Sequence, residues 1–396
     1  MTTWAHVPDG SDFPLENLPY GVFTPPGGPS RVGVRIGDHV LDLADALDDP
    51  VFAAPALNPF MRQGPRRWRE VRERVTDLLS DSGHRDRVSP ALTPVDAVTL
   101  ALPFEVADYV DYYASLHHAQ NVGRMFRPDD EPLTPNWRHL PIGYHGRSGT
   151  VVVSGTPVVR PRGQHRAPSD PAPVFGPSRR LDFEAEVGFV VGVPSALGRP
   201  VGVDDIDRHV FGVVLVNDWS ARDIQAWEYR PLGPYLGKSF ATSISPWVVP
   251  LPALHAARCT PPQQDPRPLP YLRGAHDWGL DLDLAVAING HVVARPRFAQ
   301  MYWTPAQQLA HMTVNGASLR TGDLYASGTV SGPERTQRGS LLELAWNGTE
   351  PLDVGDGETR RFLEDGDIVA ISATAPGPPG TRIGFGAVTG TIGPSA

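Results

Sequence analysis

The sequence predicts a mainly β protein of the α+β class, and three observations support this fold class. The 396 residues include 40 glycines and 43 prolines. Together they are about one residue in five, well above the usual share and typical of many turns and short elements. Apolar, strand-like runs recur along the chain, and proline-rich connections such as 261–270 break any long helix. We expect a β-roll or barrel-like domain with a few helices.

Residues 1–103 are expected to form a small N-terminal unit. The runs Arg31–Ile36 and His39–Leu43 flank a Gly-Asp pair and predict a hairpin. Residues Pro65–Leu79 carry an apolar stripe at helical spacing, and a proline suits the first turn of a helix. The members of that stripe are Trp68, Val71, Val75, Leu78 and Leu79.

Residues 104–396 are expected to form a larger, strand-rich unit. The pair Asn289-Gly290 predicts a hairpin turn between two of its strands. The segments with strand character are Thr150–Val153, Leu181–Val191, Phe211–Val216, Leu280–Ile288, Leu341–Trp346 and Ile368–Ser372.

Composition excludes several classes of function. The formal net charge is −9, which argues against a nucleic-acid partner, since such binding needs an extended basic face. The single cysteine, Cys259, excludes intramolecular disulfides and thiolate metal sites and fits a reducing compartment. No apolar stretch approaches the roughly 18 residues of a membrane span, and no secretory signal is visible. We therefore expect a cytoplasmic protein without a membrane partner.

An acidic segment is the first candidate site. In a strand over Leu181–Val191, the alternation of side chains places Asp182, Glu184 and Glu186 on one face, where two carboxylates could hold one cation. A half-exposed strand with an acidic outer face is the alternative. The residues after Glu186 are apolar on both faces, which favours burial and hence neutralised or paired carboxylates.

A second carboxylate, Asp218, follows the buried run Phe211–Val216 and precedes a segment of helical character, Trp219–Trp227. It is either the N-cap of that helix or a ligand. Arg222 and Gln225 lie three residues apart, so on a helix both project from one face, where they would suit an anionic, carbonyl-bearing ligand.

The third candidate segment contains two histidines. If residues 108–121 are helical, Asp111 and His118 lie on nearly the same stripe, whereas His117 points elsewhere. A purely structural histidine is the alternative. Glu343 is the single charge in the apolar run Leu341–Trp346, and it is either a buried partner of a histidine or a residue at a sheet edge.

The charges of these segments favour a hard cation. Lys238 and Arg222 with one divalent ion would balance the four carboxylates, and an all-oxygen ligand set is what Ca²⁺ or Mg²⁺ prefers. The segment around Lys238 is not a phosphate-binding loop, because it has three residues before Gly-Lys where that motif has four. The four carboxylates are Asp111, Glu184, Glu186 and Asp218.

Six segments have a distinctive sequence. The most specific are Asn217–Gln225 and Pro231–Ser239, and the others are Asp12–Phe23, Pro141–Gly146, Gln264–Tyr271 and Ala326–Thr329. Through these segments nearly the whole chain resembles the fumarylacetoacetate hydrolase family. The resemblance implies an SH3-like β-barrel N-terminal domain, a β-roll catalytic domain and a homodimer. It also implies hydrolysis of a carbon–carbon bond in a diketo acid, 4-fumarylacetoacetate, to fumarate and acetoacetate at the end of tyrosine and phenylalanine catabolism.

The same resemblance implies a role for each site residue. His118, oriented by Glu343, would be the general base acting through water, and Arg222, Gln225 and Lys238 would stabilise developing negative charge. The implied cofactor is Ca²⁺, Mg²⁺ or both. The implied ligands of the first cation are Asp111, Glu184, Glu186 and Asp218, and Lys238 and Thr242 lie near a second one. The implied substrate-binding residues are Tyr113, Arg127, Tyr144, Gln225, Tyr229 and Thr329.

Two alternatives remain open at this point. One is another diketo-acid or enol-acid enzyme of the same fold, such as a fumarylpyruvate-type hydrolase, a hydratase or a decarboxylase. The other is a non-catalytic cation-binding scaffold. His118 and Glu343, together with the N-terminal unit, favour the hydrolase.

Overall fold

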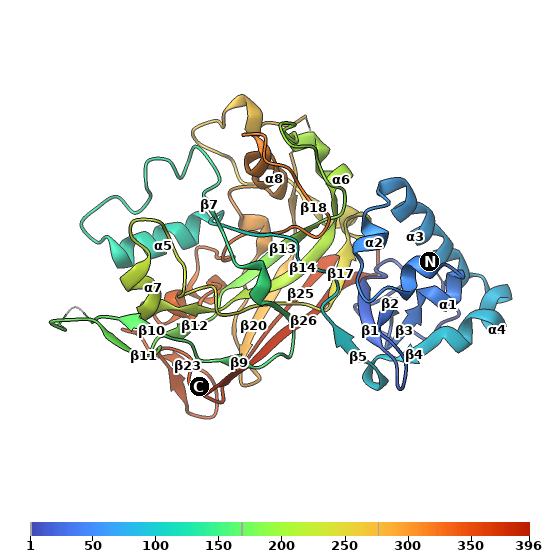
Figure 1. Ribbon diagram of the computed structural model, residues 1–396, viewed down its shortest axis with the longest axis horizontal. Coiled ribbons are helices and arrows are strands. Elements are labelled where there is room, and N and C mark those ends of the chain that lie inside the picture. The colour runs from blue at the N-terminus through green and yellow to red at the C-terminus, as the bar shows by residue number, and fades with distance from the viewer. Residues whose placement is uncertain (1, 168, 276) are drawn as a thin grey trace.

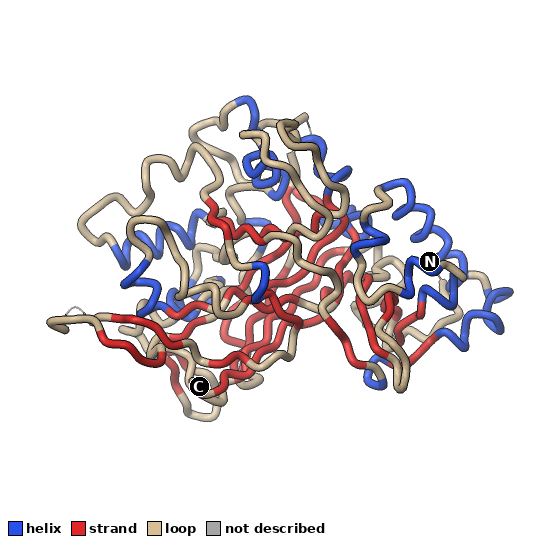
Figure 2. The backbone as a smooth tube through the Cα atoms, viewed as in Figure 1, coloured by secondary structure: helices blue, strands red, loops and turns tan. Residues whose placement is uncertain are grey.

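The structure, a computed structural model, describes residues 2–167, 169–275 and 277–396. It mixes helices and strands, with strands through the middle of the molecule and most helices around them (Figure 2). The helices are α1 (Leu43–Leu47), α2 (Asn58–Met61), α3 (Pro65–Ser80), α4 (Arg85–Val88), α5 (Leu116–Phe126), α6 (Ile206–His209), α7 (Arg222–Glu228), α8 (Pro305–Thr313) and α9 (Leu341–Leu344). Within the described ranges, none of the helices is long and apolar enough to span a membrane.

The largest sheet has 13 strands, and its main path runs β4-β3-β2-β1-β17-β14-β13-β22-β6-β7. In that order, the strands are Leu92–Pro94, His39–Asp42, Arg31–Ile36, Tyr20–Thr24, Trp247–Pro250, Val210–Asp218, Ala185–Val191, Leu324–Ala326, Tyr109–Tyr112 and Gly143–His145. Beside this path, β5 (Thr99–Ala101) pairs with β1, β16 (Thr242–Ile244) with β14, and β8 (Val151–Val153) with β16.

The second sheet has five strands in the order β21-β20-β25-β26-β9. They are His291–Ala294, Asp283–Ile288, Ile368–Pro376, Arg382–Gly393 and Val158–Val159. Among the described residues, two-stranded ribbons join β10 (Arg162–His165) to β11 (Val174–Pro177), β12 (Leu181–Asp182) to β15 (Ser220–Ala221), β18 (Arg258–Cys259) to β19 (Gly279–Leu280), and β23 (Leu352–Asp353) to β24 (Thr359–Arg360). In the part of the chain that the structure describes, neither large sheet closes into a barrel.

The N-terminal strands continue the main sheet. Tyr20 of β1 pairs with Val248 of β17, so backbone hydrogen bonds join residues of the first hundred to the long C-terminal part. Figure 1 shows this N-terminal part, in blue, beside the strands of the larger part. The hairpin of β2 and β3, the helix α3 with its buried stripe, and the Asn-Gly turn between β20 and β21 confirm three local predictions.

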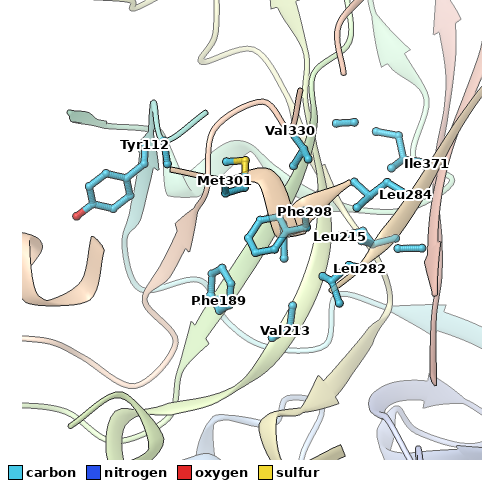
Figure 3. Packing of buried hydrophobic residues seen from close by; sticks show 14 of the residues in the cluster. Tyr112, Phe189, Val213, Leu215, Leu282, Leu284, Phe298, Met301, Val330 and Ile371 are labelled. Carbon is cyan, nitrogen blue, oxygen red and sulfur yellow. The ribbon is translucent and has the colours of Figure 1, made fainter. Parts of the chain in front are cut away.

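The central strands β13 and β14 are buried along their whole length. On one side, Val213 and Leu215 belong to the main core of the C-terminal part, which also holds Phe298 and Leu284 (Figure 3). On the other side, the core includes Val190, Val214 and Val216 of these strands and the N-terminal residues Tyr20, Val34 and Phe60. Burial on both faces explains their continuous apolar sequence and confirms that expectation for residues 187–191.

Several expectations about local structure are wrong. The expected strand Leu280–Ile288 is interrupted at residues 281–282, between β19 and β20. The run Leu341–Trp346 is not a strand, because the Ser340 hydroxyl accepts from the amide of Glu343 and starts helix α9. Residues 108–121 are not one helix but strand β6 followed by helix α5, whose N-cap is Ser115.

The other two errors concern the acidic segments. The predicted strand over 181–191 is broken after β12, because the Asp182 carboxylate turns back to accept from the amide of Phe183. Asp218 is not an N-cap, since it is the last residue of β14 and helix α7 begins four residues later at Arg222.

Candidate active site

Three carboxylates meet on one face of the main sheet. Glu186 on β13 lies opposite Val216, two residues before Asp218 on β14. Asp111 on β6 pairs with Ala326 of β22, which in turn pairs with Gly188 of β13. Side chains two residues apart share a face of a strand, so all three acids point to the same place. One oxygen from each lies within 4.8 Å of the others.

These carboxylates have the properties of a cation site. Asp111 Oδ1, Glu186 Oε1 and Asp218 Oδ1 are buried, and none has a hydrogen-bond donor among the described residues. Burial, followed by the charges of the neighbouring acids, raises the pKa of Asp111 and of Glu186 well above the ordinary carboxyl value. Buried carboxylate oxygens without donors are costly unless a cation occupies the space between them. The residues therefore fit Ca²⁺ or Mg²⁺.

Glu184 is held by two cationic side chains. Arg222 Nη2 donates to its Oε1 at 2.8 Å, and Lys238 Nζ contacts its Oε2. Burial alone raises its pKa, but Arg222, Lys238 and His118 together hold the pKa of Glu184 well below the ordinary value. Glu184 is therefore an ionised carboxylate held by two cationic side chains.

Lys238 joins Glu184 to the three-carboxylate cluster, because its Nζ also contacts Asp218 Oδ2. Burial lowers the pKa of Lys238, but Asp218 and Glu184 raise it more, so the ammonium stays charged. The Tyr144 hydroxyl lies 3.4 Å from Asp218 Oδ2. Asp218, Lys238, Tyr144 and Thr242 line a cavity of about 110 Å³, and Thr242 lies directly opposite Asp218 on β16.

The histidine lies on the other side of Glu184. His118 is buried on helix α5, and its Nε2 lies 3.5 Å from Glu184 Oε1. Its Nδ1 lies 2.7 Å from Glu343 Oε2 on α9. The structure therefore brings His118 and Asp111 to one region from a helix and a strand, not from a single helical stripe.

Glu343 is fully buried and accepts from several donors besides His118. Asn121 Nδ2 donates to its Oε1 at 2.9 Å, and the hydroxyls of Ser331 and Ser340 donate to its Oε2 at 2.8 and 2.9 Å. Burial raises its pKa, but His118 and these hydrogen bonds lower it more, so the net pKa of Glu343 lies below the ordinary value. An ionised Glu343 holds the proton of His118 on Nδ1 and leaves Nε2 as the basic nitrogen.

The expected substrate-binding residues lie at different distances from this centre. The Tyr113 ring packs edge-on against His118 with ring centroids 5.3 Å apart, and Gln225 Oε1 accepts from Arg222 Nη1 at 3.2 Å. Thr329 is buried and follows Gly328, whose amide donates to Glu186 Oε2. Of the remaining two, Arg127 donates to the Pro132 carbonyl, and the ring of Tyr229 lies under the Arg230 guanidinium.

Sequence reasoning missed four residues with direct contacts to this site. Asp182, which it placed on the acidic face without a role, accepts from Arg222 at 2.8 Å. Asn121, Ser331 and Ser340 surround Glu343. Asp182 had a usable signal, since a third acid in an apolar segment needs a buried partner. The other three are common polar residues without a distinctive spacing.

Comparisons with known proteins show the family to which this chain belongs. The family model described as fumarylacetoacetase N-terminal matches residues 16–103, and the model described as fumarylacetoacetate (FAA) hydrolase C-terminal matches residues 108–392. The chain belongs to the fumarylacetoacetase family. It is 48% identical to the fumarylacetoacetases of Bos taurus and of Homo sapiens, over 98% of this chain and 98% of each relative.

A solved structure shows the same fold. The fumarylacetoacetate hydrolase from psychrophilic Exiguobacterium antarcticum has a TM-score of 0.58 and 16% identity, over 95% of this chain and 99% of the other. At that identity the likeness concerns the fold alone. The assignment to the family therefore depends on the family models and the curated relatives.

Proposed function

We propose that this chain is an enzyme that hydrolyses the carbon–carbon bond of 4-fumarylacetoacetate to fumarate and acetoacetate, the last step of tyrosine and phenylalanine catabolism. Two relatives that are 48% identical to this chain over nearly its full length are named fumarylacetoacetase, after this activity. The observation that carries the proposal is the 2.7 Å His118–Glu343 pair beside three carboxylates with free oxygens. General base and cation site are the two parts that this hydrolysis needs.

Asp111, Glu186 and Asp218 would hold a Ca²⁺ or Mg²⁺ ion, with Glu184 at the edge of the same centre. Bound there, the ion would polarise the two oxygens of a 1,3-diketone and favour an enolate leaving group. Lys238 and Thr242 lie beside Asp218, and we propose that they would lie near a second cation.

His118 takes the proton. Its Nε2 accepts a proton from a water molecule as that water attacks the diketone carbonyl, and the electron pair of the breaking carbon–carbon bond goes to the leaving enolate. Glu343 keeps the imidazole in the required tautomer and stabilises the imidazolium, as a buried carboxylate does in hydrolytic triads. A positioned base of this kind supplies roughly 10²–10⁴-fold in rate.

Arg222, Gln225 and Lys238 supply the donors for developing negative charge. Arg222 and Lys238 are buried and both contact Glu184, so their directions are fixed before the substrate binds. Each such donor commonly supplies about 10²–10³-fold. Around them, Tyr113, Arg127, Tyr144, Tyr229 and Thr329 would hold the diketo acid, because together they offer hydroxyl donors and one guanidinium for its carboxylates.

The proposal extends to the organisation of the protein. We assign residues 1–103 to an SH3-like N-terminal domain and 104–396 to a β-roll catalytic domain, which is supported by the boundary between the two family models. We further propose a homodimer, as the resemblance to the family implies. We place it in the cytoplasm, because a single cysteine fits a reducing compartment.

Product analysis with matched variants tests this function. The wild-type enzyme with Ca²⁺ or Mg²⁺ should release equal amounts of fumarate and acetoacetate from fumarylacetoacetate. His118→Ala should fold and bind the cation but turn over at least about a hundredfold more slowly. The neighbouring, partly exposed His117 provides the control, since His117→Ala should retain wild-type turnover. Decarboxylated or hydrated products, or wild-type rates in His118→Ala, would refute the proposal.

A further inference from the structure

Asp182 makes more interactions than any role proposed above requires. It is fully buried on β12, and its Oδ2 accepts from Arg222 Nε at 2.8 Å and lies 2.7 Å from Arg222 Nη2. Arg222 Nη2 also donates to Glu184 Oε1 at 2.8 Å. Asp182 and Glu184 therefore hold the guanidinium from two sides.

The same carboxylate caps the helix that carries Glu343. The amide of Leu341 donates to Asp182 Oδ1 at 2.8 Å, and that of Leu342 donates to Asp182 Oδ2 at 3.0 Å. The third amide of α9, that of Glu343, donates to Ser340 Oγ. The amides of a first helical turn need partners outside the helix, and here Asp182 provides two of them.

Only a carboxylate can accept from all of these donors at once. With the amide of Phe183 at 2.7 Å, Asp182 accepts from four different residues, which uses the roughly four lone-pair positions of a carboxylate. An asparagine has one acceptor oxygen. Its amide group would face the amide of Leu341 in place of Oδ1, or both Arg222 and the amide of Leu342 in place of Oδ2. Either orientation therefore breaks a hydrogen bond to α9, and one of them also breaks the contact with Arg222.

We propose that Asp182 is a positioning residue of the hydrolase site, which couples the direction of Arg222 to the placement of Glu343 and, through Glu343, of His118. The inference rests on the proposed function. It assigns a role to a residue that touches neither the cation cluster nor His118 directly. The physical basis is rigidity. Arg222, 40 residues from Asp182 in sequence, and Leu341 of α9, 159 residues from it, both donate to the Asp182 carboxylate.

The test compares Asp182→Asn with Asp367→Asn. Asp367 is also buried and also accepts from an arginine and a backbone amide, those of Arg360 and Glu364, but it precedes β25 outside the site. Asp182→Asn should lower kcat by about 10–100-fold with KM changed by less than about threefold, as expected for a small misplacement of catalytic groups. Asp367→Asn should lower the thermal midpoint and leave kcat unchanged.

Two further measurements separate positioning from stability. In a Glu343→Gln background, Asp182→Asn should lower kcat by less than about threefold, because residues that act as one unit are not additive. Amide hydrogen exchange at Leu341 or at Leu342 should be faster in Asp182→Asn than in wild type, because one of the two amides loses its acceptor. Equal kcat losses in both backgrounds, or unchanged exchange, would overturn the proposal.

The remaining outcomes are also decisive. If Asp182→Asn does not fold, Asp182→Glu is the second variant, because it keeps the negative charge but moves the carboxylate. A folded Asp182→Glu protein with reduced kcat supports the proposal. Wild-type kcat in Asp182→Glu, or failure of both variants to fold, shows a structural role and overturns it. A wild-type enzyme inactive on fumarylacetoacetate refutes the proposed function instead, and amide exchange still tests the link to α9.

Discussion

Replacing Glu343 by glutamine should disable the general base while leaving the cation site intact. Glu343 accepts from His118, Asn121, Ser331 and Ser340, and glutamine loses the negative charge that selects the His118 tautomer. The corresponding change in a hydrolytic triad lowers kcat by roughly 10⁴, so we expect a loss of about 10³–10⁴ here. KM should change little, because Glu343 lies behind His118.

The stability cost of this variant is smaller than its catalytic cost. In Glu343→Gln, at least one of the four donors would face the side-chain NH2 group of the glutamine instead of an oxygen. Leaving a buried donor without an acceptor lowers the free energy of unfolding by about 1–3 kcal/mol. Steady-state kinetics, thermal unfolding and calorimetric Ca²⁺ titration would measure the three effects on one preparation. A kcat within tenfold of wild type in a folded, Ca²⁺-binding protein would contradict the assignment of Glu343.

Three further predictions concern the cation. Removing metal with a chelator should abolish turnover and lower the thermal midpoint, and Ca²⁺ at 100 times its Kd should restore about 2.7 kcal/mol of stability; an unchanged midpoint would contradict the site. Glu184→Gln should weaken cation affinity and turnover together, and unchanged calorimetric binding would exclude Glu184 from the centre. Since the raised pKa values of Asp111 and Glu186 keep protons on the metal-free cluster, cation binding should release protons and strengthen as pH rises. Calorimetry in buffers of different ionisation enthalpy measures that release, and its absence would contradict the pKa shifts.

The same shifts fix the sign of the stability change with pH. A carboxyl whose pKa is higher in the folded than in the unfolded protein binds more protons when folded, so metal-free stability should fall as pH rises above about 4. Asp111→Asn should reduce that slope, because it removes one of the two carboxyls whose pKa is raised well above the ordinary value.

The local structure followed from sequence where one physical signal dominated. Alternation and an Asn-Gly or Gly-Asp turn fixed the hairpins β2-β3 and β20-β21, and the apolar stripe fixed α3. Prediction failed where a single hydrogen bond outweighed the apolar pattern. Residues 341–346 carry apolar residues suited to a strand, but the Ser340 cap and the Asp182 carboxylate stabilise a helical turn there.

The sequence by itself determined the chemistry that this protein has available: clustered carboxylates, one histidine with a candidate acidic partner, two cationic side chains, and membership of a family. Only the tertiary structure determines which acid lies at the cation cluster and which one contacts a cationic side chain. Strand register aligns Glu186, Asp218 and Asp111 around one space, whereas Glu184 and Asp182 contact Arg222. The reason is that such pairings depend on register and side-chain direction between segments far apart in the chain, which local spacing does not specify.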